Sequence, residues 1–204
     1  MESILNRLEA LNNQIFLTIN APAGSTPWLV DIAKVLGDGL IYLIPLGLVI
    51  LWLQGGTAKR NLALRAFAVA MLAVGLNQII GLIWQHPRPF MVGLGHAWID
   101  HAPDSSFPSD HATVFFSLGF AFLAGRAFIL ASSAACCGLL VAWARILLGV
   151  HFPMDMAGGA LVAYLASIVV SPVWSYAGLK ATDLAETTYR AVFHWPISSG
   201  WIRR

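Results

Sequence analysis

The chain has 204 residues, of which 58% are hydrophobic and only 11% are charged, and its mean hydropathy is +0.72. A soluble globular chain carries about 25% charged residues, so these charges could not cover a water-facing surface, and the composition argues against a soluble protein. The formal net charge of +2 is too small to indicate a nucleic-acid partner.

The first segment, residues 3–20, is amphipathic. Apolar side chains recur at helical spacing and polar side chains lie between them. The apolar set is Leu5, Leu8, Leu11, Ile15 and Ile19, and the polar set includes Asn6, Glu9, Asn13 and Gln14. Because the segment is too polar to cross a bilayer, we expect a helix that lies in the membrane interface.

Five apolar stretches follow a break at residues 21–27, and they predict transmembrane helices. They cover about Ile32–Leu53, Leu62–Trp84, His111–Ala124, Phe128–Leu148 and Met156–Tyr176. A span needs roughly 20 apolar residues, so the third stretch is short, and we expect it to begin nearer Pro108 or to be buried among the other spans. Lipid admits only helices or closed barrels, and the sequence shows no long β alternation. The predicted fold class is therefore an all-α integral membrane protein.

We expect one membrane-embedded domain over residues 1–204. The interface helix covers 3–20, a bundle of about five transmembrane helices forms the catalytic core over 28–178, and a cytoplasmic tail covers 180–204. Two tryptophans in that tail are typical of a segment lying at the membrane interface.

Basic residues predict the orientation of the bundle. They lie between spans one and two, between spans three and four, and after span five, at Lys59, Arg60, Arg65, Arg126, Lys180, Arg190, Arg203 and Arg204. With five spans these places fall on one side, which the positive-inside rule makes cytoplasmic. The long connection 85–109 and the short turn 149–153 then face the opposite side.

Three short stretches gather most of the remaining polar chemistry at that outer face. They are His86-Pro87-Arg88-Pro89-Phe90, then Phe107-Pro108-Ser109-Asp110-His111, then the group Arg145, His151 and Asp155. Each stretch alone has an ordinary structural explanation: an arginine that snorkels to headgroups, a helix start, or a polar histidine at the interface. Together they favour function, because ionisable groups beside hydrocarbon are costly and functional by default.

The chemistry of these stretches fits phosphate. Arginine binds phosphate oxygens through a fork of donors, and the flanking prolines aim Arg88. A helix that starts near Pro108 directs free N–H groups and the positive end of its dipole outward, beside His111. His151 and Asp155 are four residues apart, so on a helix the carboxylate can fix the imidazole tautomer and leave the other nitrogen free.

The order of these residues resembles the type 2 phosphatidic acid phosphatase superfamily, which also includes the vanadium haloperoxidases. The resemblance rests on Pro-Arg-Pro, then Pro-Ser-Asp-His, then Arg, five residues, His, three residues and Asp, within about Asn77–Asp155. The stretch 104–113, with Asp110 where most members carry Gly, is most similar to the bacitracin-resistance branch, whose members are undecaprenyl-diphosphatases.

The resemblance implies a role for each matching residue. His151 would attack phosphorus to form a phospho-histidine, Asp155 would orient His151, and His111 would protonate the leaving oxygen and then activate water. The phosphate would be held by Arg88, Arg145, Ser109 and the backbone N–H groups near Asp110. No cofactor or metal is implied, so we expect metal-independent activity.

Two positions depart from the family pattern. Gly81 stands where the first motif has a lysine, and Ala144 stands where the third motif has a serine. His86 is a nearby candidate for part of the lysine's role, although it could also only cap the second span.

The resemblance predicts an undecaprenyl-diphosphatase in the bacterial inner membrane, with its site facing the periplasm or the outside, that recycles the cell-wall lipid carrier and confers bacitracin resistance. Alternatives with the same site are a phosphatidate or phosphatidylglycerophosphate phosphatase and a lipid phosphotransferase. A transporter is disfavoured because polar residues cluster at one end of the spans, without a visible repeat. The expected partners are a polyprenyl or glycerophospholipid phosphate and membrane lipid, and a homo-oligomer stays open.

Overall fold

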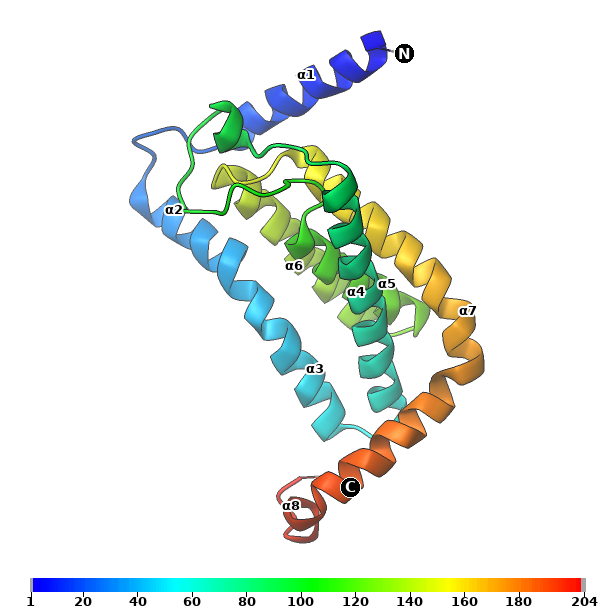
Figure 1. The fold of residues 1–204 in the computed structure, drawn as a ribbon. Coiled ribbons are helices and arrows are strands. Elements are labelled where there is room, and N and C mark those ends of the chain that lie inside the picture. Colours follow the sequence, from blue (N-terminus) through cyan, green and yellow to red (C-terminus); the bar gives the residue numbers. More distant parts are fainter. Residues whose placement is uncertain (1, 203–204) are drawn as a thin grey trace.

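The computed structural model describes residues 2–202, and every regular element within that range is helical. Figure 1 shows α4, α5, α6 and α7 packed as a bundle, with α3 standing at one side and α1 crossing one end. The all-α membrane fold predicted from the sequence is confirmed.

Within the part of the chain that the structure describes, four helices are long and apolar enough to cross a membrane. The first, Pro27–Gln54, is built from α2 (Pro27–Lys34), the π-helical turn η1 (Val35–Gly39), the 3-10 turn η2 (Leu40–Tyr42) and α3 (Leu43–Gln54). The others are α4 (Thr57–Ile83), α6 (Phe128–Leu147) and α7 (Pro153–Val192).

The helix α5 (Asp110–Ala124) is the short member of the bundle, with 15 residues. At about 1.5 Å per residue it is shorter than the hydrocarbon, and it packs against α4, α6 and α7. Ser109 caps it and Asp110 is its first residue, so the helix begins before His111 and near Pro108, as expected. Its first residue, Asp110, is exposed at the end of the bundle.

Small side chains hold these helices together. The main apolar cluster contains Ala66, Ala70, Ala73, Ala121, Ala131, Ala134 and Ala166, with Val69, Leu118, Phe122 and Val162. Alanine lets helices in lipid approach closely, so that packing contacts replace the hydrophobic effect that is absent there.

The helix α7 runs through the predicted boundary between core and tail, because its second half is fastened to α4. Arg60 and Glu186 form an ion pair with 3.6 Å between Nη1 and Oε1, and both are buried. Nearby, the amide of Asn61 donates to Thr182 Oγ1 at 2.8 Å. These polar contacts extend the helix to Val192, and α8 (His194–Ser198) follows. The predicted basic residues at 203 and 204 lie outside the described range.

The N-terminal segment forms α1 (Glu2–Ile19), which confirms the predicted helix. Phe16 is fully buried and its ring lies 5.3 Å from that of Phe152, while Asn12 Oδ1 accepts from the Met154 N–H at 3.0 Å. Leu5, Leu8, Leu11 and Ile15 remain exposed along the helix. The helix thus rests on the turn before α7 and presents an apolar face outward, as an interface helix would.

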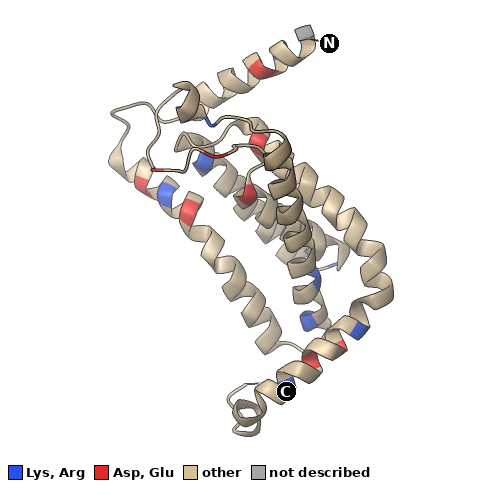
Figure 2. Ribbon diagram, in the orientation of Figure 1, with Lys and Arg blue, Asp and Glu red and all other residues tan. Residues whose placement is uncertain are grey.

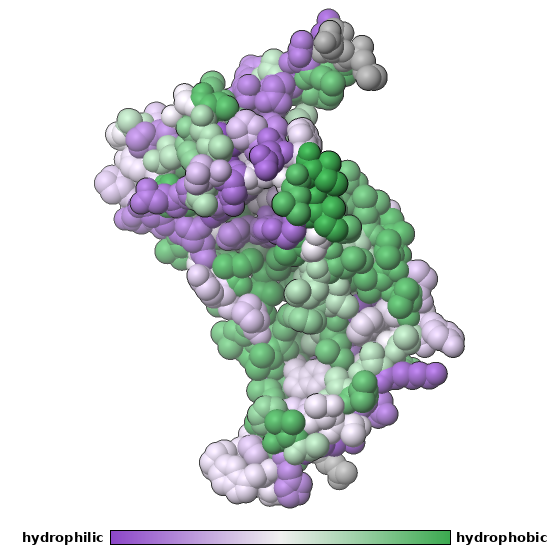
Figure 3. Space-filling view, in the orientation of Figure 1, coloured by the Kyte–Doolittle hydropathy of each residue, from purple (hydrophilic) through white to green (hydrophobic). Residues whose placement is uncertain are grey.

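The surface is divided into zones along the bundle. Figure 3 shows apolar side chains over the spans, with a polar region at the end where α1 and the connection 84–109 lie. That connection contains the short helix η3 (Pro89–Val92). Figure 2 shows charged residues concentrated toward the two ends, which suits a chain embedded in lipid.

Candidate active site

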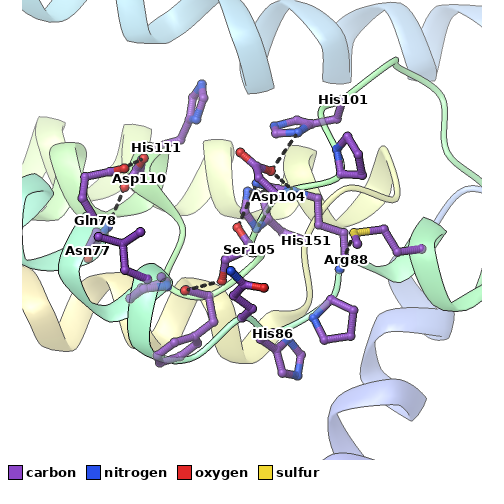
Figure 4. Close-up of a pocket in the computed structure, with 18 of the residues that line it drawn as sticks. Asn77, Gln78, His86, Arg88, His101, Asp104, Ser105, Asp110, His111 and His151 are labelled. Atoms are coloured by element: carbon purple, nitrogen blue, oxygen red, sulfur yellow. Dashed lines mark hydrogen bonds and ion pairs between the residues drawn. The ribbon is translucent and has the colours of Figure 1, made fainter.

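A cavity of about 540 Å³ opens at the polar end of the bundle. Its wall comes from the end of α4, the connection 84–109, the start of α5, the end of α6 and the turn before α7 (Figure 4). Five of the seven residues predicted from the sequence line it: Arg88, Asp110, His111, Arg145 and His151. The fold therefore brings together motifs that are up to 63 residues apart.

The surroundings of His151 indicate its tautomer. Nδ1 lies 3.2 Å from Asp155 Oδ2, and Nε2 lies 3.1 Å from Nη1 of Arg88. Because a guanidinium can only donate, Nε2 must accept there, and Nδ1 carries the proton shared with the carboxylate. His151 therefore keeps the lone pair of Nε2 on the side of Arg88.

Asp155 is buried behind His151 and does not line the cavity. Its Oδ2 accepts from the Phe152 N–H at 2.7 Å and from the hydroxyl of Ser106, which also lies 3.3 Å from Nδ1 of His151. Three neighbours thus fix one carboxylate oxygen, and the carboxylate fixes the imidazole.

Arg88 is held by the backbone as well as by charge. Its Nη1 donates to the Val150 carbonyl at 2.9 Å, its Nη2 to the Ser105 carbonyl at 3.2 Å, and its Nε to Asp104 at 2.8 Å. The guanidinium is 5% exposed, so its direction beside His151 is set before any substrate arrives.

Arg145 reaches the cavity from the last turn of α6, with 2% of its side chain exposed. It forms an ion pair with Asp38, which lies in the π-helical turn of the first span. A cation so deeply buried needs such an opposite charge.

The start of α5 brings Asp110 and His111 to the cavity and buries Ser109 beside it. Asp110 and His111 line the cavity, whereas Ser109 is fully buried and uses its hydroxyl to accept from the Ala112 N–H at 3.5 Å. The Asp110 carboxylate accepts from the amides of Asn77 and Gln78, at 2.8 and 3.0 Å. Ser109 thus serves the helix cap and Asp110 is tied to α4, while the end of the helix dipole faces the cavity.

The two departures from the family pattern have different surroundings. Gly81 lines the cavity, and a Cβ there would lie 3.6 Å from the Ser105 side chain. His86 also lines it, with Nε2 4.0 Å from Glu9 of α1. Ala144 is fully buried in the cluster that joins α6 to the first span, so its missing hydroxyl removes nothing from the cavity.

Several residues around the site were not predicted from the sequence. They are Asp38, Asn77, Gln78, His101, Asp104 and Ser106. Asp38 could have been found from the sequence, because it is a charged residue that interrupts an apolar stretch. Ser106 and Asp104 adjoin the second motif but have ordinary loop composition, so only the folded connection shows which way they point.

Burial sets the protonation of the residues in these connections. It lowers the pKa of His151 to about 4, although the hydrogen bond and charge of Asp155 work the other way. Burial also lowers the pKa of His101, whose ring lies 6.2 Å from that of His151. Burial works against the charged form of Asp104, but the hydrogen bond and charge of Arg88 outweigh it and lower its pKa. His151 is therefore neutral near pH 7, as a nucleophile requires.

Within residues 2–202, no group of three His, Cys, Asp or Glu side chains is placed to hold a metal ion. Metal-independent activity stays a prediction that a chelator can test.

The comparison with known families agrees with the geometry. A family model described as the PAP2 superfamily matches residues 62–178. Escherichia coli YbjG, which is provisionally named an undecaprenyl-diphosphatase, is 36% identical over 196 residues, covering 96% of this chain and 99% of YbjG. The undecaprenyl-diphosphatase BcrC of Bacillus subtilis is 32% identical over 155 residues, covering 76% of this chain and 80% of BcrC.

Solved structures share the fold. Aquifex aeolicus LpxE superposes with a TM-score of 0.61 at 23% identity, covering 78% of this chain and 93% of LpxE. A PAP2-type phosphatidylglycerolphosphate phosphatase from Bacillus subtilis superposes with a TM-score of 0.56 at 21% identity, covering 82% of this chain and 86% of that one.

Proposed function

The chain belongs to the PAP2 superfamily and is a membrane-embedded lipid phosphatase, and on that premise we propose that it hydrolyses undecaprenyl diphosphate to undecaprenyl phosphate and inorganic phosphate. The observation that carries the chemistry is the line Arg88–His151–Asp155, with a neutral imidazole between a phosphate-binding cation and an orienting carboxylate. The two relatives named for this reaction support the substrate.

The first step of the proposed mechanism is attack by His151. Nε2 forms a bond to the terminal phosphorus while the bond to the bridging oxygen breaks, and His111 gives that oxygen its proton. Arg88, 3.1 Å from Nε2, holds a phosphoryl oxygen beside the nucleophile, and Arg145, which also lines the cavity, holds another. Asp155 stabilises the positive charge that forms on the imidazole.

The second step releases phosphate from the phospho-histidine. His111, now neutral, takes a proton from water as the oxygen attacks phosphorus, and the bond to Nε2 breaks. The electron pair returns to His151, and inorganic phosphate leaves. This cycle restores both histidines and consumes one water molecule.

An apolar cavity supports a substrate with a long hydrocarbon chain. It has a volume of about 490 Å³ and lies between α3, α5 and α6. Phe115, Leu118 and Phe122 line it at helical spacing below His111, which faces the active-site cavity on the same helix. A phosphate at His111 would therefore place its lipid tail along α5, inside the membrane.

Phosphate release from the purified protein tests this proposal. We expect undecaprenyl diphosphate to be hydrolysed in EDTA, and we expect His151→Ala to abolish turnover while leaving the protein folded. Undiminished release by His151→Ala would refute the nucleophile. Faster turnover of phosphatidate or phosphatidylglycerophosphate in the same assay would replace the proposed substrate, and transfer to an added lipid acceptor would make the protein a phosphotransferase.

A further inference from the structure

Asp38 is an acidic residue inside a span, and the mechanism above does not use it. Charged side chains within spans are costly and are kept for a partner or a function. Asp38 also lies in the π-helical turn η1. Such turns are rare in proteins, and those that occur are often found at functional sites. Its partner, Arg145, lines the active-site cavity.

The pair is asymmetric. Arg145 has 2% of its side chain exposed and Asp38 has 47%, and the carboxylate is not part of the cavity wall. Nη1 of Arg145 donates to Oδ1 of Asp38, so the carboxylate approaches the guanidinium from the first span. The pairing therefore fixes one side of the guanidinium while Arg145 still borders the cavity.

The first span is shaped for this approach. Gly37 is buried, and a Cβ on it would lie 3.2 Å from Leu148 Cδ1 and 3.4 Å from Arg145 Cδ. A larger residue would therefore press on the Leu148 and Arg145 side chains, which would have to move to make room for it. The turn η1 packs against α6 here, so glycine and aspartate together set the distance between the first span and Arg145.

We propose that Asp38 is a positioning residue that holds Arg145 in the orientation that binds phosphate, which makes the first span part of the active site. The inference rests on the proposed function, in which Arg145 binds the phosphoryl group. The negative charge of Asp38 repels an incoming phosphate. Removing that charge would, however, leave the buried Arg145 guanidinium unpaired and free to turn, and this loss of orientation outweighs the repulsion that is relieved.

Phosphate affinity and steady-state kinetics test the role of Asp38. For Asp38→Asn we expect the Kd for inorganic phosphate, measured by calorimetry in detergent, and the KM for the lipid to rise about 10-fold, with a smaller change in kcat. Asp31→Asn is the matched control, since Asp31 is exposed on the same span, and it should leave both constants unchanged. Wild-type or tighter phosphate binding by Asp38→Asn would overturn the proposal.

Two further variants separate positioning from a folding defect. Asp38→Asn added to Arg145→Gln should weaken phosphate binding no further than Arg145→Gln alone, because one residue acts through the other. Asp38→Glu should recover part of the affinity. Additive losses of phosphate affinity in the double variant would contradict the positioning role. So would a loss of affinity that accompanies a lowered melting temperature and is not restored by Asp38→Glu. If the wild type binds phosphate in this Asp38-dependent way but does not cleave undecaprenyl diphosphate, only the proposed function fails.

Discussion

Ser106 is a fully buried residue whose hydroxyl contacts both Asp155 and Nδ1 of His151. Ser106→Ala removes one of the three donors to Asp155 Oδ2 and loosens the imidazole. We expect kcat to fall about 10-fold with little change in KM, because orientation is lost and not substrate contact. Phosphate release over a range of lipid concentrations separates the two constants.

Ser117→Ala provides a matched control for that change. Ser117 is equally buried in α5, and its hydroxyl has no hydrogen-bond partner within the described residues. Kinetics like those of the wild type are expected for it. An equal fall in kcat in the two variants would show that removing any buried hydroxyl disturbs the bundle, and would contradict a specific role for Ser106.

The pKa of His151 predicts an unusual pH profile. Burial holds it at about 4, so the imidazole stays neutral and nucleophilic well below the ordinary histidine value. As pH falls through about 4, protonation removes the lone pair, and kcat/KM, which reports the free enzyme, should fall there. The rate is measured over about pH 3 to 8, a range that includes both this pKa and the ordinary histidine value. The ionisation of the substrate is followed by phosphorus NMR.

Recovery of the rate on return to neutral pH serves as the control for acid denaturation. An acid limb near a pKa of about 6.5, the ordinary value for histidine, would mean that water reaches the imidazole and that the burial of His151 is wrong.

At this scale the sequence predicted residues within motifs and missed those that support them. Arg88, His111 and His151 could be identified because their neighbours in the chain carry the pattern. Asp38 contacts Arg145 across 107 positions, and such pairs depend on how helices pack, which local sequence does not specify. Ser109 was predicted to bind phosphate; its hydroxyl accepts from the Ala112 N–H at 3.5 Å, and a role toward phosphate stays a prediction.

Among the helices, α3 offers a test of the lipid groove. Gly47 lines the apolar cavity, and a Cβ there would meet nothing within 4 Å. Gly47→Leu should displace about two methylenes of substrate, at roughly 0.8 kcal/mol each, and raise the KM for undecaprenyl diphosphate about 10-fold. A short-chain, water-soluble phosphate ester should be hydrolysed as by the wild type.

Gly75→Leu controls for the added bulk. Gly75 is exposed on α4 with equally open space around it, and it is not part of the cavity wall. Its kinetics should not change for either substrate. If Gly47→Leu also leaves the long-chain KM unchanged, the tail does not lie between α3 and α5.

The lengths of the spans followed from hydropathy, but irregularities within them did not. Apolar stretches predicted four long helices and one short helix, and the structure has this set. The π-helical turn η1 and the extension of α7 depend on contacts with α6 and with Arg60, which lie elsewhere in the chain. Hydropathy measures the preference of a segment for lipid and carries no information about these partners.

For the whole molecule, the distribution of charge predicts which side of the membrane the active site faces. Lys59 at the start of α4, Arg126 between α5 and α6, and Lys180 and Arg190 in the second half of α7 lie at the end opposite the cavity. Arg88 and Arg145 at the cavity end are buried in ion pairs. Exposed basic residues stay in the cytoplasm. The cavity should therefore face the periplasm or the outside, where it would meet a diphosphate lipid on the outer leaflet.

Cysteine labelling in intact cells checks this orientation in a background with Cys136 and Cys137, the free cysteines of α6, replaced by serine. Asp100→Cys, exposed in the connection 84–109, should react with a membrane-impermeant maleimide, and Lys180→Cys, exposed on α7, should react only after the cells are opened. If Asp100→Cys still reacts and Lys180→Cys still does not once only the outer membrane has been permeabilised, Asp100 lies in the periplasm. Labelling of Lys180→Cys but not Asp100→Cys in intact cells would show that the bundle has the opposite orientation, because the two positions lie at opposite ends of the membrane-spanning helices. The active site would then work on lipid phosphates of the cytoplasmic leaflet.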